Sequence, residues 1–263
     1  METVKRLLSS CYRHAYSSVG LRRTGHHLAQ IPLVGPLIRK TSRAVTAIRS
    51  QRSWMETPYG WMLVDDYWER HYLARGNPEP DVCPTLQSLL RKGVCFYDIG
   101  AHLGFYGLMA SRMACHPVFA FEPDPENAAV CRQIFVRNSA LVEVIEAAVC
   151  DSDGSVTFAR SGGINIGGKI CDDGPLHVPC VTLDAFVRSH PAPDVIKIDV
   201  EGAELQVLEG AAHLLRDRRP TLMVEVHDET FEPRIGEMLK PLGYRIDVLS
   251  PGRGGHVLAT FRP

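Results

Sequence analysis

The chain has 263 residues, of which 45% are hydrophobic and 22% are charged, and its formal net charge is −1. These ordinary globular values exclude a chain that is mainly disordered, collagen-like or coiled-coil. The apolar stretch 28–38 is too short to span a bilayer and contains two prolines, so no transmembrane helix is expected. The length favours one α/β domain with an extension.

Charge is divided unevenly along the chain. Residues 1–55 carry ten Lys and Arg against the single acid Glu2, a net charge of +9, which leaves −10 for the remainder. The acidic remainder argues against nucleic-acid binding. The basic segment is open to three interpretations: a solvated extension, a weak peripheral contact with an anionic membrane, or an organelle transit peptide.

The eight cysteines stand singly among apolar residues, without a C-x-x-C pair or the spacing of zinc ligands. They are Cys11, Cys83, Cys95, Cys115, Cys131, Cys150, Cys171 and Cys180. We expect reduced core thiols in a cytoplasmic protein.

Apolar residues at helical spacing predict an amphipathic helix over 4–19, within a basic and partly helical extension at 1–55. The segment 56–93 begins with several aromatic residues and is expected to be a cap over the core, although its rings are also suited to contact a substrate.

From residue 94 to 263, strand-like and helix-like runs alternate, which indicates βαβ units and a parallel sheet. The expected strands are 94–99, 117–122, 142–147, 195–200, 221–226, 244–249 and 256–261, and the expected helices are 103–114, 125–138, 204–216 and 230–240. A Gly- and Asp-rich stretch, 151–180, is expected to leave this pattern as a hairpin. The short turn 251–255 permits only a hairpin, so the sheet should end in an antiparallel pair.

A glycine-rich loop follows the first of these strands, in the sequence DIGAHLGFYG at 98–107. Its glycines let the backbone approach a ligand, and the helix that begins there offers free N–H groups. The spacing G-x-x-x-G-x-x-G differs from that of dinucleotide sites, and Asp98 precedes the first glycine. A carboxylate there favours a ligand with an ammonium group over a pyrophosphate.

Acidic residues end the following strands. Glu122 closes the second strand, where a carboxylate can accept hydrogen bonds from two ribose hydroxyls. Asp199 and Glu201 lie at a neighbouring strand end, where ligands of open α/β sheets bind. Glu225 and His227 share one side of the next strand, and His227 is the best-placed titratable base.

These motifs, together with FEPDPEN at 121–127, VTLDAF at 181–186 and KIDVEGAELQVLEGA at 197–211, resemble the FkbM family of S-adenosylmethionine-dependent methyltransferases over about residues 80–250. The resemblance implies a Rossmann-like class I methyltransferase fold: a mostly parallel seven-stranded sheet with an antiparallel last strand and helices on both faces. It also implies S-adenosylmethionine as the cofactor.

The family pattern assigns the methionine end of the cofactor to Asp98, Gly100, Ala101, Gly104 and the loop at His102, the ribose to Glu122, and the adenine to the backbone near Ala147 and Ala148. It places Asp199 and Glu201 near the transferable methyl group and the acceptor. His102 departs from the family, whose members more often have Asn there, so only the backbone contact is carried over.

The function expected is O-methylation of a hydroxyl on a saccharide or another small-molecule acceptor. Such a reaction needs an aligned oxygen and a proton acceptor, for which Asp199 and His227 are candidates, with Glu201 as an orienting residue. A divalent metal held by Asp199, Glu201 and His227 is an open alternative, although no metal ligand is assigned. The chain lacks the Asn/Asp-Pro-Pro-aromatic motif of nucleobase N-methyltransferases.

Two other functions remain as alternatives. The first is an NAD-dependent oxidoreductase, which the glycine spacing disfavours. The second is a non-catalytic nucleotide-binding protein tethered to an anionic surface by its basic segment, which leaves the acidic motifs unexplained. The sequence does not indicate an oligomeric state.

Overall fold

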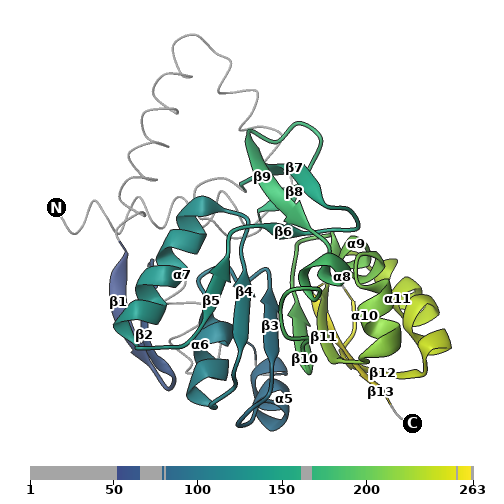
Figure 1. The fold of residues 1–263 in the computed structure, drawn as a ribbon, viewed down its shortest axis with the longest axis horizontal. Coiled ribbons are helices and arrows are strands. Elements are labelled where there is room, and N and C mark those ends of the chain that lie inside the picture. The colour runs from purple at the N-terminus through teal and green to yellow at the C-terminus, as the bar shows by residue number, and fades with distance from the viewer. Residues whose placement is uncertain (1–51, 66–78, 80, 161–167, 253, 262–263) are drawn as a thin grey trace, which may run out of the picture. The chain divides into compact units, whose positions relative to one another are not determined.

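Seven strands form the central sheet, in the order β12-β13-β11-β10-β3-β4-β5 (Figure 1). The computed structural model describes residues 52–65, 79, 81–160, 168–252 and 254–261. The predicted helix at 4–19 and nearly all of the basic segment lie outside these residues. So do Tyr67, Trp68 and Tyr72 of the aromatic segment.

The sheet is parallel except for one strand. Its members are β3 (Phe96–Ile99), β4 (Val118–Phe121), β5 (Glu143–Ile145), β10 (Val195–Ile198), β11 (Thr221–Val226), β12 (Tyr244–Ser250) and β13 (Gly255–Phe261). The last strand, β13, inserts between β11 and β12 and runs antiparallel to both. The predicted reversed last strand is therefore confirmed.

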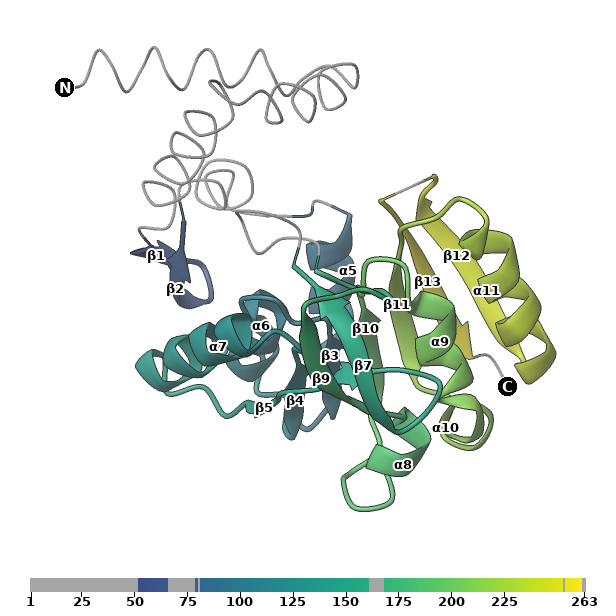
Figure 2. The same ribbon diagram turned by 90° about the horizontal axis from the view of Figure 1, so that it is seen from above.

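Helices cover both faces of the sheet, as expected (Figure 2). One face packs against α5 (Val82–Leu89), α6 (Phe105–Arg112) and α7 (Pro125–Arg137). The other packs against α8 (Leu183–Phe186), α9 (Glu204–Glu209), α10 (Ala212–Asp217) and α11 (Phe231–Leu239), which a 3-10 turn, Lys240–Leu242, extends. The four central strands β3, β4, β10 and β11 have almost entirely buried residues, which explains their continuous apolar runs.

The single helix predicted at 204–216 is two helices, α9 and α10. The chain turns at Gly210, where a Cβ atom would lie only 1.9 Å from the carbonyl oxygen of Cys150. A close approach of two backbones therefore accounts for both the glycine and the interruption.

The segment 151–180, predicted to form a hairpin, contributes most of a second sheet, in the order β6-β9-β7-β8. Its strands are β6 (Ala148–Val149), β7 (Gly154–Ala159), β8 (Lys169–Ile170) and β9 (Leu176–Val181), and β7 pairs antiparallel with β9. Cys150 and Cys180 form a disulfide across its base. The expectation of eight reduced thiols is wrong for this pair, and the cysteine argument for a cytoplasmic location is lost.

A hairpin of β1 (Ser53–Thr57) and β2 (Gly60–Val64) runs across the predicted boundary at 55/56 into the aromatic segment. The guanidinium group of Arg137 lies 4.5 Å from the ring centre of Trp54 and 4.8 Å from that of Trp61. Tyr59 packs edge-on against Phe105 of α6, at a centroid distance of 5.6 Å. These three aromatic residues are structural cover over α6 and α7.

None of the helices in the described ranges combines the length and apolar character that crossing a bilayer requires.

Candidate active site

A cleft lies where the carboxyl ends of β3, β4, β10 and β11 meet. Eight of the residues predicted from the sequence line it: Gly100, Ala101, His102, Glu122, Ala147, Ala148, Asp199 and Glu201. Three others, Asp98, Gly104 and His227, do not belong to its lining. The structure thus brings residues from five separate chain segments to one edge of the sheet.

The glycine loop depends on its glycines for two different reasons. Gly100 has φ +79°, and a Cβ atom on it would lie 1.7 Å from the carbonyl oxygen of Asp199, so the loops after β3 and β10 approach each other there. Gly104 has φ +78°, and its Cβ would lie 2.6 Å from the ring of Phe135. The first glycine permits contact between the loops, and the second lets α7 pack against the start of α6.

Asp98 lies at the end of β3 and is fully buried. Its Oδ2 atom accepts a hydrogen bond of 3.0 Å from the N–H of Gly107, but Oδ1 has no hydrogen-bond partner within the described part of the chain. Burial raises the pKa of Asp98 to about 6, against the opposing pull of Lys197. An orphaned carboxylate oxygen at this place fits the ammonium group that the sequence motif predicts.

Glu122 lines the cleft and is only 5% exposed. Its Oε2 accepts from the N–H of His102 and its Oε1 from the N–H of Asp124, both at 2.8 Å. Burial raises the pKa of Glu122 to about 8, although both N–H donors act in the opposite direction. The side chain of Asn127 also bonds to this carboxylate, whose remaining acceptor capacity fits a ribose hydroxyl.

Lys197, on β10, is a site residue that the sequence reasoning left out. It is 3% exposed, its Nζ lies 2.9 Å from Oδ2 of Asp199, and its ammonium lies 4.7 Å from the ring centre of Tyr106. Burial opposes the charge, but Asp199, Asp98 and Glu79 together raise the pKa of Lys197. Asp199 is also desolvated, yet Lys197 and His227 lower its pKa. A buried ion pair therefore lies beside the cleft.

His227 follows β11 and is held by a buried carboxylate on α9. Its Nδ1 lies 2.6 Å from Oε1 of Glu204, while its Nε2 lies 3.5 Å from Glu201 and 3.7 Å from Asp199. Burial opposes protonation, but the hydrogen bond to Glu204 and the surrounding carboxylates raise the pKa of His227 to about 9. The imidazole is therefore cationic at neutral pH in this arrangement.

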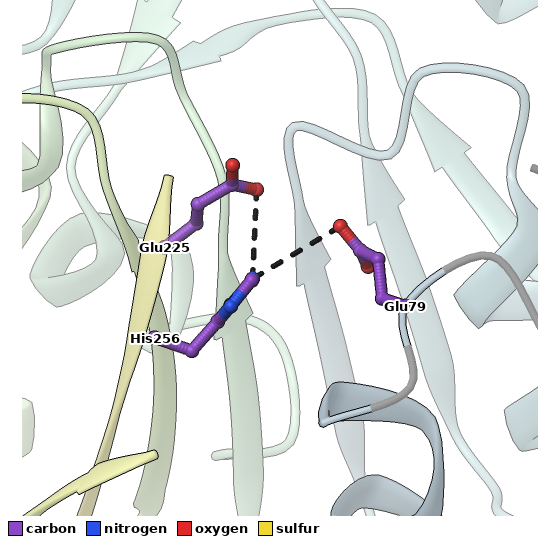
Figure 3. Close-up of side chains that lie close together, drawn as sticks. All are labelled: Glu79, Glu225 and His256. Atoms are coloured by element: carbon purple, nitrogen blue, oxygen red, sulfur yellow. Dashed lines mark ion pairs between the residues drawn. The ribbon is translucent and has the colours of Figure 1, made fainter. Parts of the chain in front are cut away.

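A further group continues the site toward β13. Glu225 of β11 faces His256 of β13 directly across the antiparallel pair, and Glu79, just before α5, points toward both (Figure 3). The sequence analysis assigned no role to Glu79 or His256. A glutamate and a histidine within apolar strands, Glu225 and His256, were a signal of a polar site. The pairing of β11 with β13, which brings them together, could not be read from their spacing in the sequence.

Two groups of donor atoms lie within 4.8 Å of one another and could hold a metal: Asp199, Glu225 and His227, and Glu79, Glu225 and His256. The group considered from the sequence, Asp199, Glu201 and His227, is not one of the two found within the described residues. Glu225 belongs to both groups.

The strand order, with a reversed last strand between β11 and β12, defines a class I methyltransferase fold. Residues 98–246, more than half of the chain, match the model of the methyltransferase FkbM domain. The chain is 30% identical over 167 residues to the hexuronic acid methyltransferase AglP of Haloferax volcanii, a match that covers 62% of this chain and 67% of that protein.

Two solved structures are also similar. The methyltransferase FkbM from Methylobacillus flagellatus KT has a TM-score of 0.49 at 20% identity, and the match covers 65% of this chain but only 45% of that one. The precorrin-6y C5,15-methyltransferase from Geobacter metallireducens GS-15 has a TM-score of 0.49 at 14% identity, with coverage of 71% and 89%.

The matched domain shows that the chain belongs to the FkbM family of S-adenosylmethionine-dependent methyltransferases. This confirms the family and the fold expected from the sequence, and it sets aside the oxidoreductase alternative.

Proposed function

We propose that this protein transfers a methyl group from S-adenosylmethionine to an oxygen atom of a saccharide or a similar small-molecule acceptor. One observation carries the proposal: Asp199 and Glu201 border the same cleft as the glycine loop and Glu122. His227, outside the lining, contacts both carboxylates. Carboxylates suit an acceptor rich in hydroxyl groups. The relative named as a hexuronic acid methyltransferase supports a sugar acceptor.

The cofactor would occupy the side of the cleft formed by the glycine loop. The backbone of 100–102 would contact its methionine end, Glu122 would accept from the ribose hydroxyls, and Ala147 and Ala148 would border the adenine. The orphaned Oδ1 of Asp98 and the close approach at Gly100 support this orientation. When bound, the cofactor supplies an electrophilic methyl group on a sulfonium sulfur.

The chain's own task is then to align the acceptor oxygen and receive its proton. We assign the proton-accepting role to Asp199, because its carboxylate lines the cleft, whereas His227 lies outside the lining and is already protonated at neutral pH. Glu201 orients the acceptor hydroxyl. His227 fixes the two carboxylates through contacts of 3.5 and 3.7 Å.

The contact of the basic segment with membranes, like the cytoplasmic location, stays a prediction, because residues 1–51 lie outside those described. Comparing sedimentation of the full chain with anionic and neutral liposomes, with and without residues 1–50, tests it. We expect binding to anionic vesicles only, and only with the segment present.

Calorimetric titration with S-adenosylhomocysteine tests the cofactor assignment. We expect saturable binding that weakens at least tenfold in Glu122→Ala, no binding of NAD, and unchanged binding in Glu143→Ala, whose side chain is exposed on β5. If well-folded protein fails to bind S-adenosylhomocysteine, the proposal is wrong.

Incubation with S-adenosylmethionine and a panel of uronic acid and neutral glycosides then tests the acceptor. NMR of the product distinguishes a methyl ether from a methyl ester. A methyl group found on nitrogen, with no activity on sugars, would contradict O-methylation of a saccharide.

A further inference from the structure

His256 presents an unpartnered nitrogen atom to two carboxylates. Its side chain is 8% exposed, and its Nε2 has no hydrogen-bond partner within the described residues. The nitrogen points between Glu225 and Glu79, 3.7 Å from Oε2 of the first and 4.0 Å from Oε1 of the second (Figure 3). Both distances exceed those of hydrogen bonds, so the three groups face one another across a gap.

The surrounding structure holds all three groups in place. Glu225 and His256 are cross-strand neighbours on β11 and β13, so the sheet fixes their separation. The hydroxyl group of Tyr106 donates to Oε2 of Glu79, which leaves Oε1 turned toward His256. Ser250 Oγ lies 3.4 Å from Nδ1 of His256 and can accept a hydrogen bond from Nδ1–H, the tautomer in which Nε2 carries the lone pair.

The two distances from Nε2 of His256 to the carboxylate oxygens fit one ion. Two ligand atoms that each lie about 2.1 Å from a metal are about 3.4 Å apart at a tetrahedral angle and about 4.2 Å apart when opposite each other. The observed 3.7 and 4.0 Å lie between these values, and the three atoms fall within 4.8 Å of one another. Two carboxylates and one imidazole form a donor set suited to Mn²⁺ or Zn²⁺.

The charges nearby also favour a cation at this point. Lys197 pairs with Asp199 at 2.9 Å and His227 with Glu204 at 2.6 Å, while Nε2 of His227 also lies 3.5 Å from Oε1 of Glu225, which leaves Oε2 of Glu225 toward His256. Glu79 and Glu225 both line the cleft. A divalent ion would relieve the repulsion between these carboxylates.

We propose that Glu79, Glu225 and His256 bind one divalent transition-metal ion at the edge of the cleft. The alternative group, Asp199 with Glu225 and His227, is less suitable, because both of its other donors are already engaged. Oδ2 of Asp199 accepts from Lys197, and Nδ1 of His227 is bonded to Oε1 of Glu204. The free coordination positions of the ion would face the cleft and take oxygen atoms of the acceptor. That last use of the ion rests on the proposed function, whereas the ion site itself does not.

Binding of Mn²⁺ to the full chain tests the site directly. The purified protein is stripped with a chelator, dialysed and titrated with MnCl₂, while electron paramagnetic resonance reports free Mn²⁺. Competition with ZnCl₂ follows. We expect one bound ion per chain, and a dissociation constant raised at least tenfold in both Glu79→Gln and His256→Gln. The matched control is His177→Gln, an exposed histidine on β9, which should bind as the wild type does.

Three results would overturn the site: no saturable binding, binding unchanged in both variants, or loss of binding in His227→Gln alone, which would identify the other group. Glu79 lies in a loop outside the sheet, so Glu79→Gln keeps the test open if His256→Gln fails to fold, as circular dichroism would show. S-adenosylhomocysteine titration of the same samples keeps the two proposals apart. If the protein binds S-adenosylhomocysteine but not Mn²⁺, only the ion site is wrong. If it binds Mn²⁺ but not S-adenosylhomocysteine, only the proposed function is wrong.

Discussion

His227 and Glu204 form a buried pair, with Nδ1 of the imidazole 2.6 Å from Oε1 of the carboxylate. Glu204 is fully buried at the start of α9, and the same oxygen atom accepts from the N–H of Gly202 at 3.1 Å. The carboxylate is thus fixed by the chain that follows β10, and it fixes in turn a histidine that follows β11. One contact couples the two strand ends that border the acceptor side of the cleft.

Glu204→Gln should lower turnover without changing substrate affinity. The amide keeps the size of the side chain but removes the negative charge that holds the imidazolium, so the orientation of His227 toward Asp199 and Glu201 is loosened. We expect kcat to fall roughly tenfold, about 1.4 kcal/mol, with KM for both substrates nearly unchanged. Glu209→Gln, exposed at the end of the same helix, is the control. A lower free energy of unfolding, together with a fall in kcat and a change in KM, would indicate a purely structural role.

His227→Asn should have a larger effect on the same step. Without the imidazole, Asp199 and Glu201 lose the cation that lies between them, so the group that receives the acceptor proton is no longer held. We expect kcat to fall by roughly 10²-fold or more, while calorimetry shows S-adenosylhomocysteine binding within twofold of the wild type. His213→Asn, on the exposed side of α10, should be indistinguishable from the wild type. An unchanged turnover number in His227→Asn would remove this residue from the mechanism.

Much of the fold could be predicted because each central strand is buried on both faces and each is followed by a turn and a helix. The runs that contain β3, β10 and β11 are apolar and short, and such runs between helical segments indicate a parallel sheet. The turn at 251–255 likewise allowed only a hairpin. These features depend on local sequence, which is why they were accessible without a structure.

The rest of the site depends on contacts between distant segments. Glu225 and His256 face each other because of the register of β11 against β13. Glu79, which precedes α5, approaches His256 from another part of the chain. The disulfide between Cys150 and Cys180 similarly requires β6 and β9 to be neighbours. Lys197 was accessible in principle, because a lysine inside the apolar run of β10 must find a carboxylate partner.

Replacing Gly100 by alanine should destabilise the protein more than replacing Gly93. Both glycines have a positive φ, +79° and +83°, so alanine is strained at each by about 1 kcal/mol. Only at Gly100 does the new Cβ meet an atom, the carbonyl oxygen of Asp199 at 1.7 Å; at Gly93 nothing lies within 4 Å. We expect urea unfolding to show at least about 2 kcal/mol more loss for Gly100→Ala. Equal losses would contradict the tight approach of the two loops.

Lys197→Met should be strongly destabilising although methionine is more apolar. The substitution leaves Asp199 and Asp98 beside the cleft without their buried cation, and removing one member of a buried pair costs roughly 3–5 kcal/mol. Urea unfolding of the variant, compared with Lys92→Met at an exposed position before β3, measures this. A cost below about 1 kcal/mol would show that the two carboxylates are not held by Lys197.

Glu122 should make the protein less stable as the pH rises from about 5 to 8. Burial raises the pKa of this carboxyl group from its ordinary 4.5 to about 8, so within that window the folded state keeps a proton that the unfolded state has lost. Because the folded state binds more protons, the free energy of unfolding falls with pH, by at most about 1.4 kcal/mol per pH unit from this group.

Glu122→Gln removes the titration, so its free energy of unfolding should rise relative to that of the wild type at each step when both are unfolded in urea at pH 5, 6.5 and 8. Glu143→Gln, at an exposed position on β5, should follow the wild type throughout. Saturating S-adenosylhomocysteine should reduce the slope of the wild type, because ribose hydroxyls that donate to Glu122 favour its ionised form. Parallel curves for the wild type and Glu122→Gln would mean that the carboxyl group is already ionised in the folded protein, and that burial is outweighed by the N–H groups of His102 and Asp124.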